Sequence, residues 1–93
     1  MTALDVMALR HRLGVERSLF ARVTGADTRT VTRWEKDQCS PSGASLAVMT
    51  ALQEALDTAD VPKAARIAAY VVRAAQLGGL SYLMVKLLND TVP

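Results

Sequence analysis

Aromatic side chains and cysteines are scarce in this chain. Of its 93 residues only 4% are aromatic although 51% are hydrophobic, so the apolar residues are mainly alanine, leucine, valine and methionine. This composition favours helices over sheets. The single cysteine, Cys39, excludes an internal disulfide and a cysteine-based zinc site, and it suits a reducing cytoplasm.

Signals for membranes and for catalysis are also missing. No stretch approaches the roughly 20 apolar residues of a membrane span, and no basic region followed by an apolar run marks a signal peptide. The single histidine and the single cysteine suggest no catalytic triad, the carboxylates do not cluster, and no glycine-rich loop could cradle a phosphate. We therefore expect a cytoplasmic protein that is not an enzyme and that uses no metal, cofactor or small-molecule ligand.

A few breaks divide the chain into short helical segments. Only three prolines and five glycines interrupt it, and apolar residues recur at helical spacing between them. The pattern predicts helices over residues 5–13, 17–24, 27–36, 41–56, 62–77 and 80–88. The expected N-caps are Asp27 for the third helix, Ser40 or Ser42 for the fourth and Asp60 for the fifth.

The segment 17–36 is the most informative part of the chain. Ala21 is small enough to let two helices cross closely, and Gly25, four residues later, permits the turn conformation that a Cβ would oppose. Phe20 supplies the apolar face of the first of these helices, and Trp34 that of the second. This spacing is the residue plan of a helix-turn-helix.

The same segment resembles the lambda-repressor-like, Xre-type family of DNA-binding domains. The resemblance covers residues 4–57 and is carried by Leu9-Arg10, Leu13-Gly14-Val15, Phe20-Ala21, Thr24-Gly25, the string TVTRWEK at 30–36, Pro41 and the helix over 46–56. It implies an all-α fold, a lambda-repressor-like helix-turn-helix bundle, with a DNA-binding domain over residues 1–58. The last third of the chain, residues 59–93, resembles no known family.

The exposed face expected for the helix 27–36 is rich in arginine and threonine. Residues 10–36 hold seven basic and three acidic side chains, a local net charge of +4, whereas the other residues carry four and six, or −2. A basic surface of this kind attracts the phosphates of nucleic acid, and arginine can bind guanine through two parallel hydrogen bonds. The alternative interpretation is an ordinary solvated helix face.

The resemblance also assigns roles to individual residues. It places Thr28, Arg29, Thr32 and Arg33 at base-reading positions, and Arg17 and Lys36 at phosphate contacts. Ser42 and Gly43 open the fourth helix, where free backbone N–H groups could bind another phosphate or could simply be capped. Glu35 is expected to form a structural ion pair with Arg10. The family usually has Ser or Thr where this chain has Glu16, Gln where it has Arg17, and Gly where it has Asp37.

The C-terminal helices are the only predicted helices outside the DNA-binding domain, so contacts between two copies of the chain are expected there. One such domain touches few base pairs, so a dimer on two half-sites about 34–36 Å apart is expected. The residues assigned to dimerisation are Ile67, Tyr70, Leu80, Leu83, Met84, Leu87 and Leu88. The alternative is that these helices fold back and complete a monomeric core.

Together these features predict a sequence-specific regulator of transcription, a homodimeric repressor of its own operon that binds an inverted-repeat operator in double-stranded DNA. The resemblance suggests a bacterial or phage-encoded protein that acts on the nucleoid. The alternative function is a protein-interaction adaptor or antitoxin that keeps the helix-turn-helix as a scaffold and binds a protein partner through its apolar C-terminus.

Overall fold

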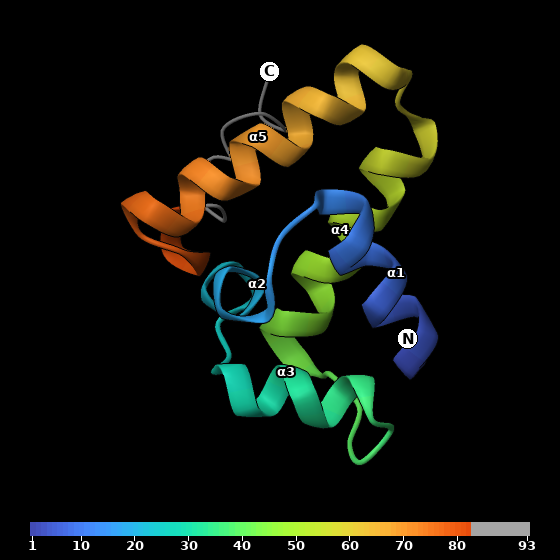
Figure 1. Cartoon of the computed structure of the whole chain (residues 1–93), viewed down its shortest axis with the longest axis vertical. Coiled ribbons are helices and arrows are strands. Elements are labelled where there is room, and N and C mark those ends of the chain that lie inside the picture. The colour runs from blue at the N-terminus through green and yellow to red at the C-terminus, as the bar shows by residue number, and fades with distance from the viewer. Residues whose placement is uncertain (83–93) are drawn as a thin grey trace.

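The protein is built from α-helices (Figure 1). The computed structural model describes residues 1–82, which contain no strand. The helices are α1 (Ala3–Leu13), α2 (Arg17–Thr24), α3 (Thr28–Glu35), α4 (Gly43–Thr58) and α5 (Val61–Leu77), and residues 80–82 are helical again. The all-α class predicted from the composition is confirmed. The expected final helix, 80–88, lies mostly outside the described residues.

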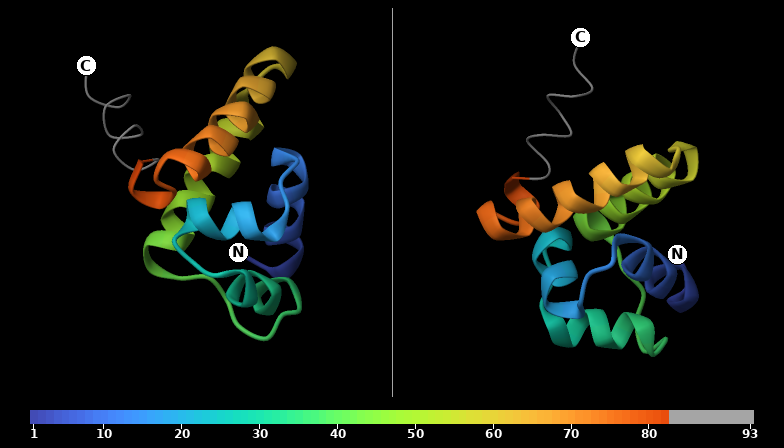
Figure 2. Two further views of the ribbon diagram at one scale, coloured as in Figure 1. Left: turned by 60° about the vertical axis from the view of Figure 1, so that its left-hand side comes forward. Right: turned by 45° about the horizontal axis from the view of Figure 1, so that its top comes forward.

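The helices pack so that α3 and α5 lie on opposite sides of the bundle. The first two helices contact α3, α4 and α5, whereas α3 packs mainly on α1 and α2. Figures 1 and 2 show α5 along one side and α3 along the other in each view. The outward side of α3 is therefore left uncovered by the other described helices.

One hydrophobic core joins all five of these helices. Its fully buried large side chains include Leu9 from α1, Phe20 from α2, Val31 from α3, Met49 from α4 and Val71 from α5. The two other buried residues of α5 are Ala74 and Ala75, which allow it to lie close to α2. Thus α5 contributes to the same core as the helices before it.

Helix boundaries differ from the sequence predictions by one or two residues at several places. The first helix begins at Ala3 rather than residue 5, because Thr2 and Asp5 form a reciprocal capping box with hydrogen bonds of 2.9 and 3.2 Å. The fourth begins at Gly43 rather than residue 41, and the side chain of its N-cap residue, Ser42, forms no capping hydrogen bond. The predicted N-caps Asp27 and Asp60 are confirmed.

The residues assigned to dimerisation fall into two groups. Ile67, Tyr70 and Leu80 are half-buried and pack against the core of their own chain. Leu83, Met84, Leu87 and Leu88 lie outside the described residues. Within residues 1–82, no helix combines the length and apolar character needed to cross a membrane.

Candidate nucleic-acid interface

The turn between α2 and α3 is fixed at both ends. Gly25 ends α2 with a φ of 75°, a left-handed conformation that suits glycine, and its N–H donates to the carbonyl of Ala21. Ala26 N–H donates to the same carbonyl at 2.9 Å. At the other end, the carboxylate of Asp27 accepts a 2.7 Å hydrogen bond from Thr30 N–H. The first turn of α3 is therefore held in a defined place relative to α2.

The helix α3 has one buried and one exposed side. Val31 is fully buried and Trp34 is only 5% exposed, so both fix α3 to the body of the protein. Thr28, Arg29, Arg33 and Lys36 are exposed, and Thr32 is half-buried with its hydroxyl donating to the carbonyl of Thr28 at 3.0 Å. The structure thus brings the four predicted base-reading residues together on and beside the outward side of one helix.

The cations on the outward side of α3 form no ion pair with an acidic side chain among residues 1–82. Within the described part of the chain, the ion pairs involve Arg10, Arg12 and Arg17 but not Arg29, Arg33 or Lys36. The pKa of Asp27 is lowered, mainly by the hydrogen bonds from Thr30 and further by the charges of Arg29 and Arg33. The outward side of α3 therefore carries a positive charge that is available to an anionic partner.

A buried ion pair anchors the side of α3 that faces the body of the protein. Glu35 is 8% exposed, and its carboxylate accepts hydrogen bonds from Arg10 Nε at 2.7 Å and Arg10 Nη2 at 3.0 Å. Such a pair of parallel bonds fixes both distance and orientation. Arg10 Nη1 also donates to the carbonyl of Val15 at 3.2 Å, so the guanidinium joins α1, the loop after it and α3. The ion pair predicted between Arg10 and Glu35 is present.

Arg17 is a third member of this cluster, which sequence reasoning missed. Its Nε and Nη2 donate to Glu35 Oε1 at 3.4 and 3.3 Å, and 43% of its side chain is exposed. It borders a shallow hollow that is lined by Arg10, Glu16, Arg17, Ser18 and Thr28. No local spacing reveals this contact, since Arg17 and Glu35 lie on different helices. Arg17, predicted to bind a phosphate, therefore rests on a carboxylate through long hydrogen bonds.

The start of α4 lies near the start of α3. Ser42 and Gly43 are exposed, and Gly43 has a φ of 58° with open space where a Cβ would be. Ser45 Oγ donates to the carbonyl of Thr24, which ties the first turn of α4 to the end of α2. Between them lies an open hollow lined by Gly25, Ala26, Asp27, Thr30, Trp34, Cys39, Ser40, Ser42 and Ser45. Ser42 and Gly43, two of the four residues assigned to phosphate binding, are therefore accessible on this side of the molecule.

Two positions at which the sequence departs from the pattern it resembles have visible local effects. Glu16 is the N-cap residue of α2, but its side chain forms no capping hydrogen bond. Asp37 has a φ of 59°, so the turn after α3 adopts the left-handed conformation without a glycine. Aspartate tolerates that conformation better than most residues, and the expected turn is retained.

The buried carboxylate gives a pH-dependent prediction. Burial raises the pKa of Glu35, but the hydrogen bonds and charges of Arg10 and then Arg17 outweigh it, and the pKa lies below the ordinary value of 4.5. A lowered folded-state pKa contributes stability that is complete above the unfolded pKa and is lost as pH falls through the folded one. We expect the free energy of unfolding to decrease as the pH is lowered past about 4.5. The decrease should be less steep in Glu35→Gln. Urea titrations between neutral and acidic pH measure the difference; parallel curves would contradict it.

Comparison with known proteins adds no family assignment to this arrangement. No family model, curated protein or solved structure matches the chain. The function of the surface formed by α3 and the start of α4 therefore follows from its own residues and their charge.

Proposed function

We propose that the protein is a sequence-specific DNA-binding regulator of transcription with a lambda-repressor-like helix-turn-helix. The observation that carries this proposal is the outward side of α3, which carries threonines and arginines that form no ion pair within residues 1–82. Val31, Trp34 and Glu35 anchor the opposite side. A helix held in this way can enter the major groove without losing its orientation, which is what base reading requires.

The proposed roles follow from chemistry and position. Arg29 and Arg33 donate paired hydrogen bonds to guanine, and Thr28 and Thr32 contact base edges or the thymine methyl group. Lys36, at the end of α3, contacts a phosphate. Backbone N–H groups at Ser42 and Gly43 bind a second phosphate, because the start of a helix carries unpaired donors.

Arg17 fits a conditional role as a phosphate contact. Its hydrogen bonds to Glu35 are long, at 3.3 and 3.4 Å, whereas Arg10 keeps Glu35 paired through shorter ones. Moving Arg17 from Glu35 to a DNA phosphate therefore leaves the buried carboxylate with a partner. The exchange replaces two long hydrogen bonds to a carboxylate by a contact with a phosphate, and both kinds of contact are charge-assisted.

The proposed regulator acts as a homodimer on an inverted repeat. One α3 reads few base pairs, and pairing through α5 and the residues that follow it adds a second reading helix. A dimer on a promoter would exclude polymerase sterically, and an operator in its own promoter would make the protein, bacterial or phage-encoded, an autorepressor in the bacterial cytoplasm. No enzymatic activity is proposed.

Selection from random duplex DNA tests the function, and the symmetry of the selected site tests the dimer. We expect an enriched site with two inverted half-sites, and an affinity that falls steeply with salt because phosphate contacts release counterions. Enrichment of a single half-site would contradict the dimer. Weak binding to all duplexes alike would contradict sequence-specific regulation and would favour the adaptor or antitoxin, in which the C-terminus binds a protein.

A further inference from the structure

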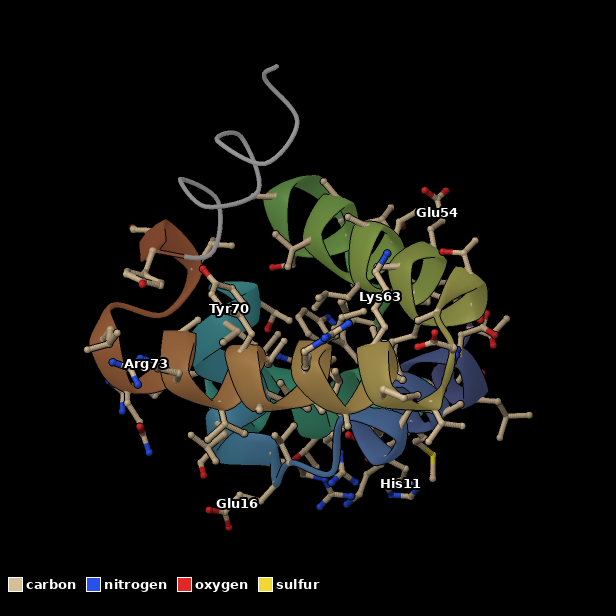
Figure 3. The ribbon with its side chains drawn as sticks, turned by 90° about the horizontal axis from the view of Figure 1, so that it is seen from above. His11, Glu16, Glu54, Lys63, Tyr70 and Arg73 are labelled. Carbon is tan, nitrogen blue, oxygen red and sulfur yellow. The ribbon has the colours of Figure 1, made fainter. Side chains whose placement is uncertain are left out.

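The chain returns to α2 immediately after α5. The N–H groups of Gly78 and Gly79 donate to the carbonyl of Ala74 at 3.0 and 2.7 Å, and residues 80–82 begin another helical turn. In Figures 1 and 2 this orange segment lies beside the end of α2 in every view. Figure 3 shows Tyr70 of α5 directed toward the same segment, and the rings of Tyr70 and Tyr82 lie 6.2 Å apart between centroids. Residues 78–82 are therefore folded onto both α2 and α5.

Two close approaches join this segment to the end of α2. Gly79 is buried with a φ of 63°, and a Cβ on it would lie 2.5 Å from the carbonyl oxygen of Arg22. The side chain of Leu80 lies against one side of Gly25, which is otherwise exposed; a Cβ on Gly25 would collide with its Cδ2 and lie 3.5 Å from its Cγ. Both approaches involve the last turn of α2 or the glycine that ends it.

Gly25, which contacts Leu80, lies in the turn that orients α3 relative to α2. Gly25 ends α2 and Asp27 caps α3, so the turn 25–27 sets how the two helices are related. Leu80 is half-buried and packs against the core cluster. Removing an apolar contact from a tight turn lowers the free energy needed to open the turn locally, because fewer contacts oppose the opening. Leu80 is thus placed to hold this turn closed.

We propose that residues 79–80 form a clasp that couples the C-terminal segment to the orientation of α3. Leu80 acts as a positioning residue: it touches no DNA but restricts the turn from which α3 starts. Since coupling is reciprocal, a second copy that keeps residues 80–82 seated on α2 strengthens DNA binding, and DNA binding strengthens the seating. The link to DNA depends on the proposed function, whereas the clasp itself does not.

A double-mutant cycle tests the contact without DNA. Gly14→Ala is a matched control, because Gly14 has a φ of 69° like the 75° of Gly25 but nothing lies within 4 Å of its added Cβ. We expect Gly25→Ala to raise the unfolding equilibrium constant more than Gly14→Ala does, with the excess largely lost in a Leu80→Ala background. Equal effects of the two glycine variants, or an excess that persists without Leu80, would overturn the clasp.

Hydrogen exchange and DNA affinity then test the coupling. Leu4→Ala is the matched control, since Leu4 is a leucine of α1 that is 76% exposed and lies outside the proposed pairing region. Leu80→Ala should speed exchange of the Ala26 amide and weaken binding to the selected duplex, each by about tenfold, a size within the range of coupling between contacting residues. Leu4→Ala should change neither. Leu80→Val replaces Leu80→Ala if the latter does not fold.

The outcomes separate the clasp from the proposed function. Unchanged exchange at Ala26 in Leu80→Ala would overturn the clasp, and faster exchange with unchanged DNA affinity would overturn its coupling to α3. A wild-type protein that binds no duplex would refute the proposed function and with it the coupling to DNA. The cycle and the exchange rates would still decide the clasp in that case.

Discussion

Replacing Glu35 by alanine is expected to lower the free energy of unfolding by about 3 kcal/mol, the lower end of the cost of breaking a buried ion pair. The variant leaves the guanidinium of Arg10, whose side chain is only 13% exposed, without its carboxylate partner. Arg17, 43% exposed, can turn to water and adds little to the cost. Chemical denaturation of the two proteins measures the difference at neutral pH.

The ion pair between Arg12 and Asp57 provides the control for this prediction. It is as short, at 2.7 Å, but its side chains are 41% and 60% exposed. Arg12→Ala should therefore cost at most about 1 kcal/mol, as exposed pairs do. Equal losses in Glu35→Ala and Arg12→Ala would mean that burial adds nothing to the Glu35 cluster. A double variant, Arg10→Met with Glu35→Leu, should recover part of the loss because no buried charge is left unpaired.

Local signals in the sequence were sufficient for much of the α2–α3 unit. Asp27 lies before a helical run and was predicted as its cap, and Gly25 was predicted to permit the turn. Both are local, because each concerns a backbone conformation within a few residues. Trp34 was expected on the apolar side of its helix and is buried, and the arginines expected on the exposed side are exposed. The ion pair between Arg10 and Glu35 came from family resemblance rather than from spacing.

Contacts between distant segments could not be read in the same way. The hydrogen bonds from Arg17 to Glu35, the ion pair from Arg12 to Asp57 and the seating of Leu80 on Gly25 each depend on how separate helices pack. Hydrophobic periodicity reports which side of a helix is buried but not what covers it. Periodicity therefore predicts an apolar side at Leu80, and the structure adds that this side chain packs within its own chain against Gly25.

The other large effect is expected on DNA recognition. Arg33→Ala should remove about 1–3 kcal/mol of discrimination at one base pair of the selected site, because a bidentate arginine reads guanine specifically. Arg29→Ala should relax a different base pair, since its side chain leaves α3 one turn earlier. Repeating the selection with each variant measures which position loses its preference. Arg33 is exposed and makes no ion pair within residues 1–82, so its loss should leave folding intact.

Two further variants separate base reading from charge. Lys36→Ala, at a proposed phosphate contact, should weaken binding to all sequences alike and lower the salt dependence by about one unit. Arg73→Ala removes the same charge from α5 (Figure 3), on the side of the bundle away from α3, and should change binding little. If Arg33→Ala instead weakened every duplex equally, Arg33 would be a phosphate contact, and base reading would fall to Arg29 with Thr28 and Thr32. If Arg73→Ala weakened binding as much as Arg33→Ala, overall charge rather than the surface of α3 would account for the affinity.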